Sequence, residues 1–199
     1  MKKLSFIAVA CLAVFGFQAC NDDGSDDAIK SANESNEVKQ DSAEHSGANN
    51  QAASTVSEED SKFAVEAASG GMMEVQLGEL AQQKASSQAV KNFGSMMVRD
   101  HSKANDELKA LAGNKNITLP PAPGEDHMDH IKKLSEKSGK EFDKDYISMM
   151  VDDHQDDIDK FEKCSKDAKD PELKAFADKT LPKLREHLAA AKKIQDGMK

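Results

Sequence analysis

Aromatic residues and strand-like patterns are scarce in this sequence. Its 199 residues include one tyrosine and no tryptophan, and no segment alternates polar and apolar residues with a period of two. Half-buried β-strands show that alternation and are enriched in aromatic and β-branched side chains. The sequence therefore predicts an all-α fold.

Positive charge is not in excess in any part of the chain that could fold. The formal net charge is −9, and it comes mostly from residues 21–60, which hold eleven acidic residues and two lysines. Residues 61–199 hold 25 acidic and 23 basic residues. A nucleic-acid-binding domain needs a basic face, so we expect no nucleic-acid partner.

Two common signatures of enzymes are also missing. The chain has no glycine-rich phosphate loop, and no serine or cysteine stands in a credible nucleophile–base arrangement. The sequence therefore favours a non-enzymatic protein and predicts no catalytic residue.

The first twenty residues have the form of a secretion signal. Lys2 and Lys3 precede an apolar run, residues 4–17, that is too short for a permanent membrane helix and long enough for a signal peptide. The following Phe17-Gln18-Ala19-Cys20 resembles the lipobox of bacterial lipoproteins, where the signal is cut before a cysteine that then carries lipid, although leucine is usual in place of Phe17. The alternative is an ordinary secretory signal cut near Ala19.

We therefore predict a lipoprotein signal peptide over 1–19 and lipidation of Cys20. The lipid would anchor the protein to the outer membrane of the cell envelope, facing the periplasm or the cell surface. Cys11 would leave with the signal, so Cys164 would remain without an intramolecular disulfide partner.

Residues 20–57 are rich in Asn, Asp, Ser, Glu, Gln and Ala and have few large apolar side chains. Such a segment buries too little apolar surface to offset its ordering entropy, so it predicts a disordered acidic tether. Residues 58–199 are long enough for one domain with a substantial core.

Capping and breaking residues divide residues 58–199 into helices. Ser57 with the acids after it resembles a capping box, and Asp170-Pro171 is a helix start with an N-cap and proline at the first position. Prolines at 120, 121 and 123 indicate a long connection. Helices are predicted over about 58–84, 87–112, 126–138, 141–168 and 171–195. This pattern predicts a ferritin-like four-helix bundle with one long crossover that contains a short extra helix.

Ionisable residues fall on the apolar stripes of the four long helices. The segments SMMVRDH, residues 95–101, and SMMVDDH, residues 148–154, place a histidine at equivalent turns of two helices. Helical-wheel positions and distances from the two hairpin turns bring five residues to one depth, within roughly 9 Å along the bundle. They are Glu74, His101, His154, Asp157 and His187.

Buried charges are expensive unless they are paired or bind a metal, so this layer has two interpretations. In the first, these five residues form a site for one transition-metal ion, because imidazole suits zinc, iron and copper. In the second, the layer is only a hydrogen-bond network in a structural or interaction module. The sequence leaves both open.

Three motifs resemble those of the bacterial cell-envelope family DUF4142, whose function is unknown. They are GGMMEVQLGELAQQKASSQAVKNFGSMMVRDH, DYISMMVDDH and DPELKAFADKTLPKLREHL, and the resemblance covers roughly 60–197. It implies a ferritin-like bundle and a cell-envelope location, and it implies no activity. Positions 98, 151 and 184 lack the glutamate of the Glu-x-x-His pairs that hold two irons in ferritin-like enzymes. That departure argues against ferroxidase chemistry and favours a mononuclear, histidine-rich site.

Overall fold

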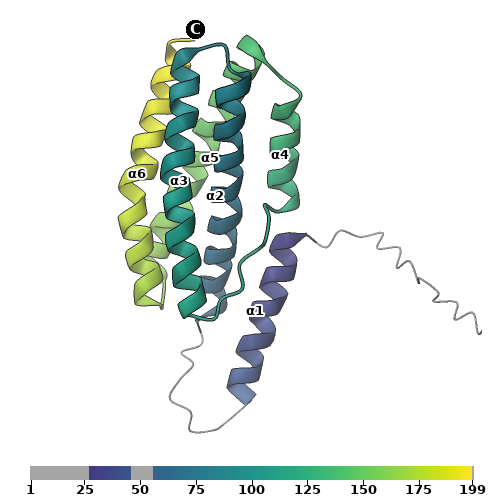
Figure 1. The fold of residues 1–199 in the computed structure, drawn as a ribbon. Coiled ribbons are helices and arrows are strands. Elements are labelled where there is room, and N and C mark those ends of the chain that lie inside the picture. The colour runs from purple at the N-terminus through teal and green to yellow at the C-terminus, as the bar shows by residue number, and fades with distance from the viewer. Residues whose placement is uncertain (1–26, 46–55, 199) are drawn as a thin grey trace, which may run out of the picture.

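The structure is a computed structural model that describes residues 27–45 and 56–198 (Figure 1). The predicted signal peptide and the lipidation residue Cys20 lie outside these ranges. Within them the chain forms six helices, and its only bridge of the strand type is an isolated one between Ala85 and Gly139. The helices are α1 (Ala28–His45), α2 (Glu58–Lys84), α3 (Gln88–Asn114), α4 (Glu125–Ser135), α5 (Gly139–Asp167) and α6 (Pro171–Asp196).

The four long helices form a bundle of two hairpins. Helix α2 packs along α3 and α5 along α6, while α2 contacts α5 and α3 contacts α6 across the bundle (Figure 1). Helix α4 lies in the connection between the hairpins and packs outside α2. The predicted all-α bundle with one long crossover and a short extra helix is therefore confirmed.

Local sequence signals begin two of these helices as predicted. The side chain of Ser57 accepts a hydrogen bond from the Asp60 amide at the start of α2. Asp170 accepts hydrogen bonds from the amides of Glu172 and Leu173, and Pro171 occupies the first turn of α6. These caps satisfy amides that have no partner inside a helix.

Each hairpin turn is also held by a buried carboxylate from the opposite hairpin. Asp143 of α5 accepts hydrogen bonds from the amides of Ser86 (3.0 Å) and Ser87 (2.9 Å). Asp60 of α2 accepts from the amides of Lys169 (3.0 Å) and Asp170 (2.8 Å). These paired contacts fix how far one hairpin slides along the other, and so fix the depth of every inward-facing residue.

Helices α2 and α3 approach closely at two glycines. A Cβ atom on Gly94 would lie 2.7 Å from the carbonyl oxygen of Gly78 and 2.7 Å from Cβ of Ala81. Farther along the same interface, the Asn105 side chain occupies the space where Gly71 has no Cβ. The close crossing brings the inward faces of α2 and α3 together on both sides of Glu74.

Two apolar clusters fill the bundle, one toward each end. The first includes Ala68, Leu108, Ile158 and Leu184. The second includes Met73, Met97, Met150 and Ala191. On α3, α5 and α6 the predicted histidine falls between residues of the two clusters, and Glu74 of α2 follows Met73 at the edge of the second. The polar layer therefore lies in the middle of the bundle.

The prediction of a disordered tether over residues 20–57 is wrong for Ala28–His45, which form helix α1. Of its residues 28–42, whose side chains the structure describes, Ala32 and Asn36 are buried. Asn36 donates to the carbonyl oxygen of Thr118 (3.0 Å) and accepts from its amide (2.7 Å), while Gln40 donates to the carbonyl of Val56 (3.0 Å). Composition predicts burial of apolar surface, and it does not predict such side-chain bonds to a distant backbone.

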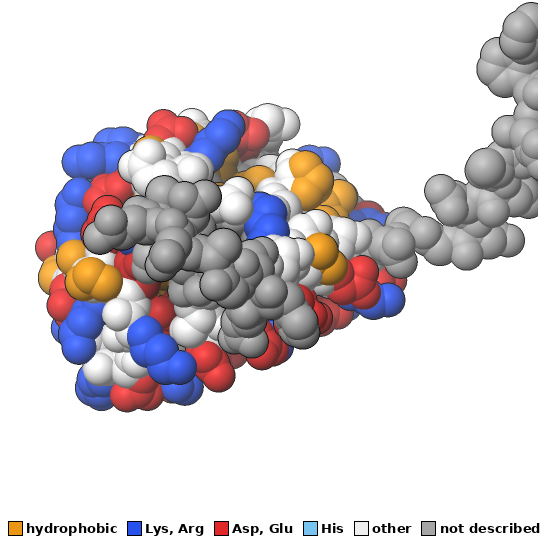
Figure 2. All heavy atoms as spheres, turned by 90° about the horizontal axis from the view of Figure 1, so that it is seen from below, with side chains coloured by type: hydrophobic (Ala, Val, Ile, Leu, Met, Phe, Trp, Pro, Cys, Tyr) orange, Lys and Arg blue, Asp and Glu red, His pale blue; other side chains and the backbone are white. Residues whose placement is uncertain are grey.

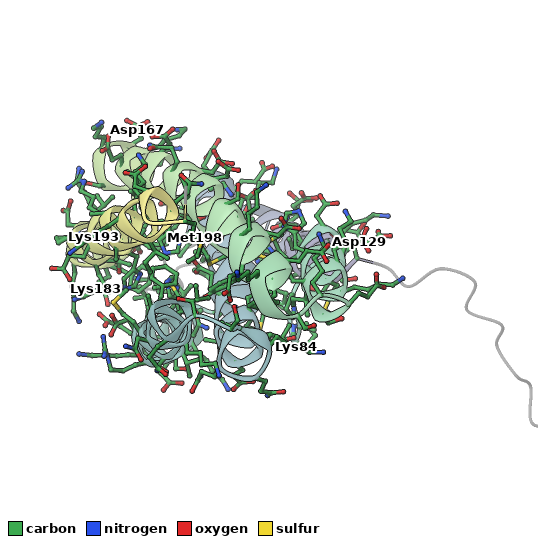
Figure 3. All side chains as sticks on the ribbon, turned by 90° about the horizontal axis from the view of Figure 1, so that it is seen from above. Lys84, Asp129, Asp167, Lys183, Lys193 and Met198 are labelled. Carbon is green, nitrogen blue, oxygen red and sulfur yellow. The ribbon has the colours of Figure 1, made fainter. Side chains whose placement is uncertain are left out.

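The surface of the bundle carries charges of both signs. Viewed from below, acidic and basic side chains are interleaved, with apolar ones only in small groups (Figure 2). Viewed from above, charged side chains point outward around the bundle, from Asp129 on α4 to Lys193 on α6 (Figure 3). Among the described helices, none has the length and apolar character needed to cross a membrane.

Candidate metal centre

One buried side chain from each long helix meets at the centre of the bundle. Glu74 comes from α2, His101 from α3, His154 from α5 and His187 from α6, and their exposed fractions are 1%, 6%, 0% and 1%. These are four of the five residues that the sequence places in one layer. The structure therefore contains a buried cluster of three histidines and a glutamate.

The three imidazole rings direct one nitrogen each toward a common point. Nδ1 of His187 lies 3.3 Å from Nε2 of His101 and 3.3 Å from Nε2 of His154. One nitrogen of each ring lies within 4.8 Å of the others. Two imidazole nitrogens bound to the same tetrahedral zinc ion lie about 3.3 Å apart, so two of these separations match such a site.

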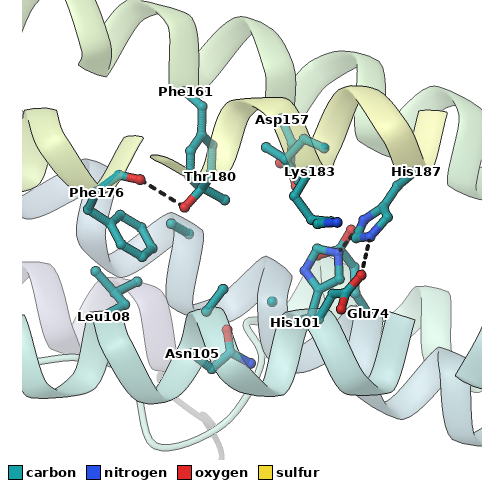
Figure 4. A pocket seen from close by; sticks show the side chains of 15 residues that line it. Glu74, His101, Asn105, Leu108, Asp157, Phe161, Phe176, Thr180, Lys183 and His187 are labelled. Carbon is teal, nitrogen blue, oxygen red and sulfur yellow. Dashed lines mark hydrogen bonds and ion pairs between the residues drawn. The ribbon is translucent and has the colours of Figure 1, made fainter. Parts of the chain in front are cut away.

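Carboxylates hold the opposite nitrogens of two of these rings. Nδ1 of His101 lies 2.6 Å from Oε2 of Glu74 (Figure 4). Nε2 of His187 lies 3.0 Å from Oδ2 of Asp100. When each ring donates its proton to its carboxylate, Nε2 of His101 and Nδ1 of His187 both present lone pairs. A carboxylate behind a histidine, fixing its tautomer in this way, is the usual support of a metal ligand.

Asp100 is a functional residue that the sequence analysis does not find. Its carboxylate pairs with Arg99 (2.7 Å) as well as with His187. The hydrogen bond from Arg99 is the main reason that the pKa of Asp100 falls to about 2. Asp100 is thus a fixed anion at neutral pH. The only sequence feature that points to Asp100 is its place between Arg99 and His101. Its partner His187 lies on another helix, so the pairing cannot be predicted from that feature.

Burial keeps the histidines neutral, which is the form that binds metals. It lowers the pKa of His101 and of His187 to about 4, against partial compensation from nearby carboxylates. It also lowers the pKa of His154, and the other two rings lower it further. For Glu74, burial and the charge of Asp157 raise the pKa well above its ordinary value.

A second group of converging atoms lies beside the first. Glu74, Asp153 and His154 each offer one ligand atom within 4.8 Å of the others. Oε1 of Glu74 and Oδ2 of Asp153 are buried without a hydrogen-bond partner in the described part of the chain. Asp153 is not among the five residues that the sequence places in the layer. The pKa of Asp153 is raised by burial and by the charge of Glu74, because two carboxyl groups share this interior.

The structure does not bring Asp157, the fifth predicted ligand, into either group of converging atoms. Its side chain is 15% exposed, and its nearest cation is Lys160 of the same helix at 3.9 Å. Asp157 instead lines the cavity beside the cluster and acts on Glu74 and His101 through its charge.

Fold and cluster together define a class of protein, an all-α bundle with a buried layer of histidines and carboxylates. The chain belongs to the family DUF4142, since the family's model, described as a domain of unknown function, matches residues 45–194. No curated protein matches the sequence.

One solved structure shares the fold. It is the crystal structure of a DUF305 fragment from Deinococcus radiodurans, with a TM-score of 0.62 and 12% sequence identity over 71% of this chain and 97% of that one. At this identity the likeness is one of fold alone.

Proposed function

We propose that the protein binds one transition-metal ion through His101, His154 and His187 and serves to hold or buffer that metal in the cell envelope. The observation that carries the proposal is the convergence of three buried ring nitrogens, with Nδ1 of His187 at 3.3 Å from both Nε2 of His101 and Nε2 of His154 and all three within 4.8 Å of one another. Two of these rings are supported from behind by Glu74 and Asp100.

The donor set indicates which metals fit. Three imidazoles with nearby carboxylates suit zinc, copper or iron, whereas magnesium and calcium prefer oxygen ligands alone. Oε1 of Glu74 has no hydrogen-bond partner among the described residues, so it is available as a further metal ligand. Burial raises the pKa of Glu74 and of Asp153, and a bound cation would favour their ionised forms.

Location in the envelope is part of the proposal. It is supported by the signal-like residues 1–19 and by Cys20 at the lipobox-like site. The lipid would then hold the bundle at a membrane surface.

A second function, a purely structural layer, is favoured by one observation, the raised pKa of Glu74. A protonated Glu74 would donate from Oε2 to Nδ1 of His101. His101 would then donate from Nε2 to His187, and His187 would donate to Asp100. This chain of hydrogen bonds closes without any cation, and the bundle would be a structural or interaction module.

Metal analysis of the chain from residue 20 distinguishes the two functions. The protein is purified without a histidine tag and with Cys20→Ser, and metal content is compared with that of His101→Ala/His154→Ala. The expected result is one equivalent of zinc, copper or iron, lost in the double variant and retained in His130→Gln, a control outside the cluster. A wild-type protein that binds none of these metals and gains no thermal stability from them would contradict the proposal.

A further inference from the structure

A small cavity adjoins the histidine cluster. Its volume is about 30 Å³, and it lies among α2, α3, α5 and α6 (Figure 4). Glu74, His101 and His187 line one side of it, and His154 does not line it. The cluster therefore has a closed face, formed by His154, and a face that opens into free space.

We propose that an ion held by the three histidines keeps one exchangeable coordination position directed into this cavity, where it binds a single water-sized ligand. This inference rests on the proposed function. Metal sites with three protein ligands and an open fourth position bind water or a small substrate there, whereas purely structural sites are closed by a fourth protein ligand.

The hydrogen bonds of Glu74 support an open position. Its Oε2 is engaged by Nδ1 of His101 at 2.6 Å, so this oxygen acts as the support of a ligand. Its Oε1 lies 3.4 Å from Nε2 of His154, the one histidine of the cluster that does not line the cavity. Even with Glu74 bound through Oε1, an ion could accept a further ligand from the cavity side.

The dimensions of the cavity select the ligand. A cavity needs a volume of roughly 10–15 Å³ to hold one water molecule, so a volume of about 30 Å³ holds one or two. Apolar side chains form the wall opposite the histidines, among them Leu108, Phe161 and Phe176. The chemical class is therefore a compact ligand with a lone pair, such as water, hydroxide or a linear triatomic anion, and an aromatic ring is excluded.

Small residues in the cavity wall provide the test. Ala104 of α3 and Ala67 of α2 both line the cavity, and a larger side chain at either position would fill it without touching a ligand nitrogen. Ala175, an exposed residue of α6, serves as the matched control.

The experiment loads the protein with Co²⁺ and titrates azide, then imidazole, while the visible absorption of the metal is recorded. We expect azide to change the spectrum and imidazole to leave it unchanged. Ala104→Leu and Ala67→Leu should each raise the apparent dissociation constant for azide by about tenfold or more, whereas Ala175→Leu should not. Co²⁺ stoichiometry and helical content should be equal in all four proteins.

The outcomes separate the two proposals. If Co²⁺ binds at one equivalent and azide leaves its spectrum unchanged, or imidazole changes it as readily, the open position is refuted and the metal site stands. If the two cavity-filling variants bind Co²⁺ and azide as the wild type does, azide does not bind in the cavity and the open position is refuted. If Co²⁺ does not bind at all, the proposed function fails and the open position fails with it.

Discussion

Nε2 of His101 and Nδ1 of His187 lie 3.3 Å apart although 86 positions separate the two residues in the chain. Each ring has its other nitrogen against a carboxylate, Glu74 for His101 and Asp100 for His187. Two lone pairs cannot face each other at this distance without a cation or a proton between them. A cation there would make the cluster a metal site, whereas a proton would make it one link of a hydrogen-bond chain.

Removing one of these rings should remove the metal. For His187→Ala we expect the bound metal to fall from one equivalent to near zero, because only two imidazoles remain. Isothermal titration with Zn²⁺ measures the change. His130→Gln is the control and should bind like the wild type. Tight binding retained in His187→Ala would show that the ion sits elsewhere.

Asp100→Asn tests the support behind His187. The amide cannot hold the ring as an anion does, so metal affinity should fall about 10- to 100-fold with little loss of folding. Competition with a chromogenic zinc chelator gives the affinity. Asp106→Asn, at an exposed position of the same helix, removes the same charge away from the cluster and should leave the affinity unchanged. An equal loss of metal affinity in both variants would show that Asp100 acts only through its net charge.

The metal-free protein should lose stability as the pH falls from about 6.5 to about 4. His101 and His187 have their pKa lowered from 6.5 to about 4 in the folded state, so the unfolded chain binds protons in this window that the folded chain does not. The free energy of unfolding therefore decreases toward acid.

The raised pKa of Glu74 acts in the opposite direction, because its contribution to stability is lost as the pH rises above 4.5. The double variant His101→Gln/His187→Gln keeps Glu74 and the facing Asp100, His154 and Asp157. Its difference from the wild type is therefore the pH dependence of stability that is due to the two histidine rings. Urea unfolding at several pH values should give a shallower acid slope in the double variant. Identical slopes would mean that the two histidines are protonated in the folded protein as readily as in the unfolded chain.

Asp60→Ala should destabilise the bundle by about 2 kcal/mol or more. The substitution leaves the amides of Lys169 and Asp170 without their acceptor in the turn between α5 and α6. Chemical denaturation measures the change, with Asp159→Ala at an exposed position as the control. A loss no larger than that of the control would mean that water replaces the carboxylate in this turn.

Asn36→Ala should release α1 and leave the bundle folded. Both hydrogen bonds between buried Asn36 and Thr118 would be lost, and the bonds that Lys39 and Gln40 still make to the bundle are exposed or only part-buried. We expect limited proteolysis within 28–45 to become several-fold faster, with the melting temperature of the bundle nearly unchanged. Ser42→Ala, on the same helix, is the comparison. Unchanged proteolysis would show that α1 is held by other contacts.

Much of the fold can be predicted from local signals. The caps at Ser57 and Asp170 and the repeated Ser-Met-Met-Val segments are sequence features, and the structure places helix starts and inward faces where these features predict them. The layer of Glu74, His101, His154 and His187 also follows from periodicity, because helical rise and rotation are nearly constant. No such regularity predicts α1, whose attachment depends on side-chain bonds to a loop some eighty residues away.

The sequence by itself determined that four long helices each carry an ionisable group on an apolar face, since that needs only the 3.6-residue period. Tertiary structure decided which of these groups and their neighbours come within bonding distance. Asp157 lies one turn from His154 on the same stripe, yet it lines the cavity and does not join the converging ligand atoms. Asp100, beside His101 in the sequence, instead supports a ring of another helix at 3.0 Å. A helical wheel gives direction to within a fraction of a turn, whereas ligand geometry is decided by distances of a few tenths of an ångström.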